Sequence, residues 1–180
     1  MGGVRILEWL APVVPAEGVD WDAAYREEMP RVFSYFRYRG FERATAEDLT
    51  SATFEKAWRA RARYRRERAA VSTWLLAIAR NVAIDHLRRS RPEVPLEDVH
   101  GRDERTPEQE ALREAQARRL RGLLAAFPER ERELLSLKYG AGATNRAIAT
   151  LTGLSESNVG TILHRTVGAL RDRWVEGGRK

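Results

Sequence analysis

TNRAIATLTGLSESNVGTILHRTVGAL, residues 144–170, is the stretch that decides the fold of the C-terminal part of this chain. Thr144 is a typical cap for a short helix, and Gly153 permits the sharp turn after it because glycine tolerates positive φ. Ser155 is a second cap, and apolar residues at helical spacing follow it. The inward positions of the two helices are Ala147, Ile148, Leu151, Val159, Ile162, Leu163 and Val167. This pattern predicts a helix-turn-helix.

The second helix of such a unit enters the major groove of DNA, where its outward side chains meet base edges. The outward positions in this chain are Glu156, Ser157, Asn158, Thr161 and Arg165. Two short helices at this spacing also occur as an ordinary hairpin in a helical bundle. The spacing alone therefore favours DNA binding without deciding it.

Composition narrows the class of protein. The 180 residues carry a net charge of +6 and no cysteine, which excludes disulfides, thiolate metal sites and thiol nucleophiles. The three histidines are scattered, so we expect no metal site and no cofactor. No apolar run approaches the roughly 20 residues needed to span a bilayer, so we expect no membrane insertion and a cytoplasmic location. Residues 21–90 and 106–180 are both basic and thus suit a polyanion.

The first half of the chain is helical in its periodicity. A helix is expected over residues 22–39, with a kink or a break at Pro30, because proline lacks the amide proton of the helix ladder. A second helix is expected over 45–62, where Thr45 and Asp48 have the spacing of a capping box. Strand alternation is not convincing at any point in the sequence.

A basic connector and a third helix follow. Six arginines and a single acid lie between Arg59 and Arg68, which makes phosphate contact more favourable than simple solvation. Ser72 is the expected cap of a helix over 72–89. Asn81, Asp85 and Arg88 share one edge of that helix, at i, i+4 and i+7.

The chain divides by composition into four parts. Residues 91–105 contain two prolines, one glycine and five acids without periodicity, and they are read as an acidic linker. Residues 21–90 and 106–180 then form two small helical domains, each near the lower size limit for an independent core. Residues 1–20 are an N-terminal extension. The predicted fold is all-α, with two small helical domains joined by the linker and a helix-turn-helix in the second.

Three blocks in this order resemble the two-domain extracytoplasmic-function (ECF) branch of bacterial RNA polymerase sigma factors. AEDLTSATFEKAWRAR at 46–61 is similar to the polymerase-binding helix of sigma domain 2. STWLLAIARNVAIDHLRR at 72–89 is similar to the helix of that domain that melts and reads the −10 promoter element. Residues 127–173, from FPERERELL onward, are similar to sigma domain 4, which reads the −35 element.

The resemblance implies three sets of binding residues. Those that would contact core RNA polymerase are Asp48, Thr53, Lys56 and Arg59, as exposed polar groups beside Phe54 and Trp58. Those that would hold −10 DNA are Arg61, Tyr64, Arg65, Arg66, Asn81, Asp85 and Arg88. Those that would read −35 DNA are Ser155, Glu156, Ser157, Asn158, Thr161 and Arg165. Trp74 is expected in the core rather than as a platform for a base.

The resemblance also implies partners and a role. Core RNA polymerase and promoter DNA are the expected partners, together with an anti-sigma factor, and the chain is expected to catalyse no reaction. A stand-alone helix-turn-helix regulator is the first alternative, and a recombinase or nuclease with such a tail is the second. The second alternative needs a nucleophile or an acidic metal cluster, and Ser72 near Arg80 and Arg88 is the nearest approach.

Three features depart from the family pattern. Ala147 stands where the family often has Glu, a change that would remove a capping or backbone contact and alter affinity or orientation at the −35 element. Gly160 lies inside the reading helix, where glycine costs about 0.5–1 kcal/mol relative to Ala. Residues 1–20 have no counterpart; Ile6, Leu7, Trp9 and Leu10 form either an amphipathic turn that packs on domain 2 or on a regulator, or part of a disordered or mistranslated leader.

Overall fold

Helices make up both halves of the chain in the computed structural model, which describes residues 19–89 and 107–176. The first half contains α1 (Trp21–Arg39), α2 (Arg43–Ala60), the 3₁₀ turn η2 (Arg61–Arg63) and α3 (Val71–Arg89). The second half contains α4 (Pro107–Ala125), α5 (Glu129–Leu135), the π-helical turn η3 (Ser136–Gly140), α6 (Asn145–Thr152) and α7 (Glu156–Glu176). The predicted acidic linker and most of the N-terminal extension lie outside the described residues.

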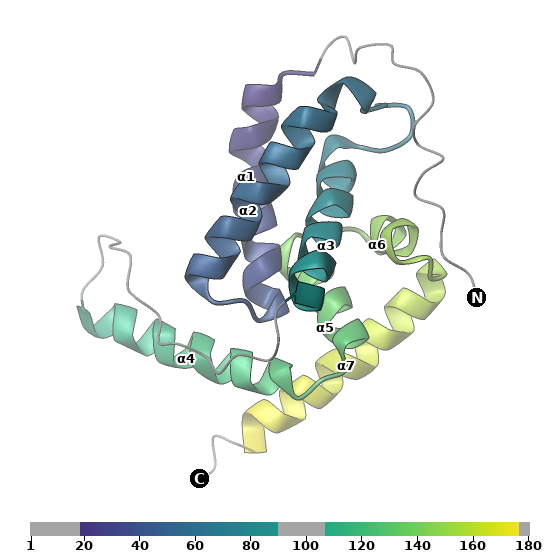
Figure 1. Cartoon of the computed structure of the whole chain (residues 1–180). Helices are drawn as coiled ribbons and strands as arrows, with labels where there is room; N and C mark the ends of the chain where they lie inside the picture. The colour runs from purple at the N-terminus through teal and green to yellow at the C-terminus, as the bar shows by residue number, and fades with distance from the viewer. Residues whose placement is uncertain (1–18, 90–106, 177–180) are drawn as a thin grey trace.

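In space, α1, α2 and α3 lie side by side, and α5 and α6 pack beneath and beside α3 (Figure 1). Helices α4 and α7 contact each other at the other end of the molecule (Figure 1). The all-α prediction and the C-terminal helix-turn-helix are confirmed. Thr144 accepts a hydrogen bond from the amide of Ala147 at 3.1 Å, and Gly153 ends α6 in the left-handed conformation at φ 74°.

Helix boundaries in the first half differ from the predicted ones in three places. A kink or a break was predicted at Pro30, and the break is excluded because α1 runs unbroken from Trp21 to Arg39. Proline has no amide proton, so the carbonyl of Arg26, four residues before Pro30, lacks its usual helical hydrogen bond. Both residues are exposed, so water can hydrogen-bond to that carbonyl. Asp20 caps the start of α1, accepting a hydrogen bond from Ala23 at 2.9 Å.

The other two differences concern caps. The predicted capping box is wrong, because α2 begins at Arg43, two residues before Thr45, and no side chain caps it. Helix α3 begins at Val71, so Ser72 lies in its first turn rather than at the cap. In both cases the helix gains extra backbone hydrogen bonds, Ala46 to Glu42 and Trp74 to Ala70. Such backbone bonds outweigh a side-chain cap that serves a single donor.

A single hydrophobic core joins the two halves. Helix α1 supplies its centre, since Val32, Tyr35 and Phe36 are fully buried. Leu76, Ala79 and Val82 of α3 join it, and the second half contributes Leu134, Leu135, Leu137, Ile148 and Val159. Each half alone is too short to bury a large core, so this shared burial compensates for their small size.

The closest junction between the halves is the packing of η3 on α1. A side-chain carbon added at Gly140 would lie 2.9 Å from the carbonyl oxygen of Ser34 and 3.1 Å from the Cα of Tyr35. Only glycine leaves room for such an approach between two backbones. The hydrogen bond from the amide of Ala141 to the carbonyl of Ser136, at 2.9 Å, widens this turn to the π form.

Two ion pairs flank this junction. Arg39 of α1, whose side chain is almost fully buried, donates to the carboxylate of Glu129 at the start of α5. Arg80 of α3 donates to Glu133 of α5 at 2.7 Å, with both side chains largely buried. Because a partly buried charge is costly without its partner, these pairs favour one relative placement of the two halves.

We predict opposite effects for alanine at two helical glycines. Gly140→Ala forces a carbon into the backbone of α1 and should lower the free energy of unfolding by about 1–3 kcal/mol. Gly160→Ala is the matched change, because its added carbon would meet only Asn145 Nδ2 at an ordinary 3.6 Å. It should raise the free energy of unfolding by about 0.5–1 kcal/mol. Urea unfolding of both variants checks the pair, and a stable Gly140→Ala variant would contradict the described junction.

Candidate nucleic-acid and polymerase interface

The helix-turn-helix presents an exposed polar face on the first turns of α7. Ser155 accepts a hydrogen bond from the amide of Asn158 at 3.2 Å, which holds the start of the helix as predicted. Val159 and Leu163 are buried on the inner side of α7 against α6 and the core. All six side chains predicted to face the −35 element are exposed: Ser155, Glu156, Ser157, Asn158, Thr161 and Arg165. The structure therefore leaves all six open to solvent at the start of α7 and along its first turns.

Two charged contacts surround this face. Arg165 donates to Glu131 of α5 at 2.9 Å, although its side chain remains 70% exposed. Arg146 of α6 lies 3.9 Å from Glu156, and both are exposed. The exposed Arg146–Glu156 pair contributes little to stability. In the other pair Glu131 is only 17% exposed, but the Arg165 guanidinium is open to an arriving phosphate. The amides at the start of α7 point toward the same surface and favour an anion.

The basic connector is organised by Tyr64, which the sequence analysis placed among the residues for −10 DNA. Tyr64 is only 1% exposed. Its hydroxyl donates to the carbonyl of Ala69 at 2.8 Å, and its ring packs edge-on against Trp21 and beside Trp74. Burial raises the pKa of the Tyr64 phenol. Tyr64 anchors the connector to the core instead of offering a free ring.

The arginines of the connector lie around this anchor. Arg63 and Arg66 are exposed, and Arg65 is half-buried. Arg61 sits 3.8 Å above the ring of Trp58 and donates to that residue's carbonyl at 2.6 Å. The anchored tyrosine thus leaves a cluster of guanidinium groups at the end of α2, where they suit a phosphate backbone.

One edge of α3 carries the other residues predicted for −10 DNA. Asn81 and Asp85 are half-exposed and Arg88 is exposed, so all three reach the surface from consecutive turns. Asp85 lies 3.5 Å from the ammonium of Lys56 on α2. This pair brings the predicted −10 surface next to the predicted polymerase surface, a proximity that spacing along the chain does not reveal.

One of the four residues predicted for the polymerase surface on α2 does not reach the surface. Asp48, Lys56 and Arg59 are exposed, and Arg59 pairs with Glu55 one turn earlier. Thr53 was predicted as an exposed contact, and that is wrong: it is fully buried and donates to the carbonyl of Leu49 at 2.7 Å. Thr53 lies four residues after Leu49, which is also buried, so it shares the inward side of α2.

Sequence reasoning missed two features of these surfaces. The first is the aromatic cluster of Trp21, Tyr64 and Trp74, whose rings come from three separate segments. Taken singly in the sequence, each of these residues indicates only an ordinary core position. Trp74 does pack in this cluster, as expected. The ion pairs of α5 with α1 and α3 join residues 90 and 53 positions apart, so no local pattern could have found them. Among the described residues no cluster of His, Asp and Glu could hold a metal ion.

Comparison with known proteins decides the family. The model of sigma-70 region 2 matches residues 24–93, and that of sigma-70 region 4 matches residues 117–170. The ECF RNA polymerase sigma factor RpoE of Cereibacter sphaeroides is 32% identical over 138 residues, covering 76% of this chain and 74% of that protein. The chain belongs to the ECF sigma factors. The ECF sigma factor BldN of Streptomyces coelicolor is 28% identical over 170 residues, which span 92% of this chain and 64% of that protein.

A solved structure supports the fold of this ECF sigma factor. The sigma factor RpoE of Bartonella quintana, co-crystallised with the anti-sigma factor NepR, superimposes with a TM-score of 0.67 at 16% identity. The superposition covers 85% of this chain and 95% of that one. No α-helix in residues 19–89 or 107–176 combines the length and the hydrophobicity that crossing a bilayer requires.

Removing the hydroxyl of two buried tyrosines should have different effects. Tyr64→Phe loses the bond to Ala69 and should lower the free energy of unfolding by about 1 kcal/mol. The hydroxyl of Tyr35 is buried with no hydrogen-bond partner among the described residues. Tyr35→Phe removes this unpaired group and should leave stability unchanged or raise it by up to about 1 kcal/mol. Chemical denaturation compares the two, and equal losses would contradict the described role of Tyr64.

Proposed function

We propose that this ECF sigma factor binds core RNA polymerase and directs it to promoters that carry −35 and −10 elements. The observation that carries the proposal is the presence, in order, of a region 2 match and a region 4 match, each with an exposed surface suited to nucleic acid. The domain divisions at 21–90, 91–105 and 106–180 and the site residues are part of this proposal.

The −35 element is read by α7. Glu156, Ser157, Asn158 and Thr161 reach base edges in the major groove, where carboxylates, amides and hydroxyls distinguish base pairs. Arg165 contacts a phosphate, exchanging its present partner Glu131 for the DNA backbone. Ser155 and the amides that follow it orient the helix start on the backbone.

Unwound −10 DNA is held by the connector and α3. Arg61, Arg65 and Arg66 supply cations, while Asn81, Asp85 and Arg88 contact a base or its backbone along one helix edge. Single-stranded DNA is held by cations together with apolar surfaces on which bases rest. Tyr64 contributes by keeping the connector in place, because its ring is buried.

Core polymerase is bound by Asp48, Lys56 and Arg59 on the exposed side of α2. Lys56 also touches Asp85, which couples this surface to the −10 surface. We propose that free DNA affinity is weak and that polymerase raises it by holding both reading surfaces at a fixed spacing, through effective concentration. Tight promoter binding without polymerase in a filter-binding assay would contradict this.

The chain works in the cytoplasm, catalyses no reaction itself, and is controlled by an anti-sigma factor. The solved relative from Bartonella quintana was crystallised with such a partner, which supports this part of the proposal. A stand-alone helix-turn-helix regulator is disfavoured, because such a protein needs no region 2 and the chain matches one over residues 24–93.

Two substitutions should separate the two binding steps. Asp48→Ala should weaken binding to core polymerase and lose all promoter-directed transcripts. Asn158→Ala should keep polymerase binding but lower transcription from −35-dependent promoters, since a base contact contributes about 1–3 kcal/mol of discrimination. Thr150→Ala, an exposed change on α6, is the control and should have neither effect.

The measurement is in vitro transcription with sigma-free core polymerase, together with a pull-down of that polymerase. Defined transcripts that appear only with this chain support the proposal. If the chain fails to bind core polymerase, a stand-alone helix-turn-helix regulator becomes the favoured function.

Phosphate contact by the connector predicts a change in salt dependence. Arg66→Gln should reduce the slope of log affinity against log salt for the holoenzyme on promoter DNA by about 0.7–0.9, the value for one phosphate contact. Arg130→Gln removes the same charge from an exposed position on α5 and should leave the slope unchanged. If the unchanged chain and both variants have equal slopes, Arg66 does not contact a DNA phosphate.

A further inference from the structure

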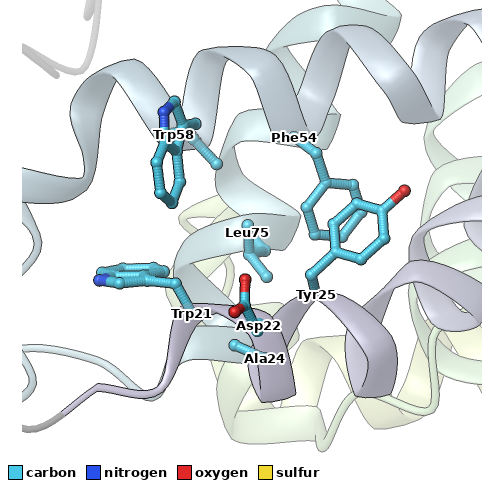
Figure 2. A pocket seen from close by; sticks show the side chains of 8 residues that line it. Trp21, Asp22, Ala24, Tyr25, Phe54, Trp58 and Leu75 are labelled. Atoms are coloured by element: carbon cyan, nitrogen blue, oxygen red, sulfur yellow. The ribbon is translucent and has the colours of Figure 1, made fainter.

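An apolar groove lies between α1, α2 and α3, at the end of the molecule where α1 begins. Its volume is about 120 Å³, comparable to one apolar side chain, and its main lining residues are Trp21, Tyr25, Phe54, Ala57, Trp58 and Leu75. Figure 2 shows the rings of Trp21 and Trp58 on one side and those of Tyr25 and Phe54 on the other, with Leu75 at the floor. No −10, −35 or polymerase contact proposed above uses these six residues.

The groove exposes large hydrophobic side chains that the fold leaves uncovered. Trp58 is 54% exposed and Tyr25 is 50% exposed, and Met29 lies one turn after Tyr25 on α1. Tyr25 and Phe54 pack edge to edge with centroids 4.7 Å apart, so the wall they form is already in place. A preformed cluster of exposed aromatic rings marks a surface that binds another apolar segment.

The chain itself carries a segment of the right chemistry, joined directly to this groove. Trp21 both lines the groove and begins α1, so residues 1–18 connect to its wall through Val19 and Asp20. Within that segment, ILEWL at residues 6–10 carries four large apolar side chains and a single charged one, Glu8. Eight residues separate Leu10 from Val19, and at about 3.3 Å each they span roughly 26 Å, ample for the segment to fold back.

Charge and tethering favour this occupant. Residues 1–20 carry one arginine and three acids, whereas Arg61 lies over Trp58 at the rim of the groove, 3.8 Å from the ring. Glu8 gives the segment a negative charge that would favour a position near Arg61. A tether of this length gives a high effective concentration, which lets a small apolar contact form.

We propose that residues 6–10 dock in this groove and insert an apolar side chain between Trp58 and Tyr25. The proposal does not depend on the sigma-factor function, because it concerns the chain's contact with itself. It assigns a role to Trp58 that polymerase and DNA contacts do not require, and it places the N-terminal segment on α2 beside Lys56 and Arg59.

The absence of cysteine makes a sharp test possible in the full chain. Gly3→Cys provides one attachment point for a nitroxide, and the indole N–H signal of Trp58 in an ¹⁵N-labelled protein is the readout. We expect this signal to lose intensity and to regain it when the nitroxide is reduced. The indole signal of Trp174, on α7 at the other end of the molecule, should keep its intensity (Figure 1).

A matched variant distinguishes docking from random approach of the tether. Trp9→Ser with Leu10→Ser, in the same labelled chain, should restore the Trp58 signal, because both changes lie before α1 and leave the folded helices intact. Equal broadening with and without the serine changes would overturn the proposal. An unaffected Trp58 would overturn it too, leaving the groove for another protein. Broadening in a mixture of nitroxide-labelled and separate ¹⁵N-labelled chains would overturn it in favour of a second copy.

Discussion

The contact of η3 with α1 is the constraint on which the rest of the structure depends. Gly140 brings two backbones to a distance that no side chain would permit, and the π form of the turn sets the chain at the angle this approach needs. Leu134, Leu135 and Leu137 then reach the same core as Val32 and Phe36. Two halves that are each marginal in size are stabilised by sharing one core.

This constraint also decides what remains at the surface. Both halves pack on helix α1, and the ion pair between Arg39 of α1 and Glu129 of α5 holds α5 against it. The outer sides of α2, α3 and α7 are left exposed, and these carry the proposed polymerase and promoter contacts. A stable shared interior therefore coexists with polar outer faces on α2, α3 and α7.

Aromatic residues play two distinct parts around the basic connector. Tyr64 and Trp74 pack inward with Trp21 and hold the connector, whereas Trp58 and Tyr25 stay exposed beside the same cluster. The first group gives the arginines a fixed base, and the second forms the groove assigned to the chain's own N-terminal segment. Burial therefore separates the rings that hold the connector from the exposed rings of the proposed groove, although both groups lie in the same part of the molecule.

Local sequence determined the helices, the turn at Gly153 and the caps Thr144 and Ser155, because these depend on periodicity and on backbone conformations that few residues adopt. It also determined which side of α7 faces outward. Tertiary structure alone decided that Tyr64 is buried against Trp21 and Trp74 and that Lys56 meets Asp85. Those outcomes depend on contacts between residues far apart in the chain, and a local pattern carries no record of which distant surface will cover a given side chain.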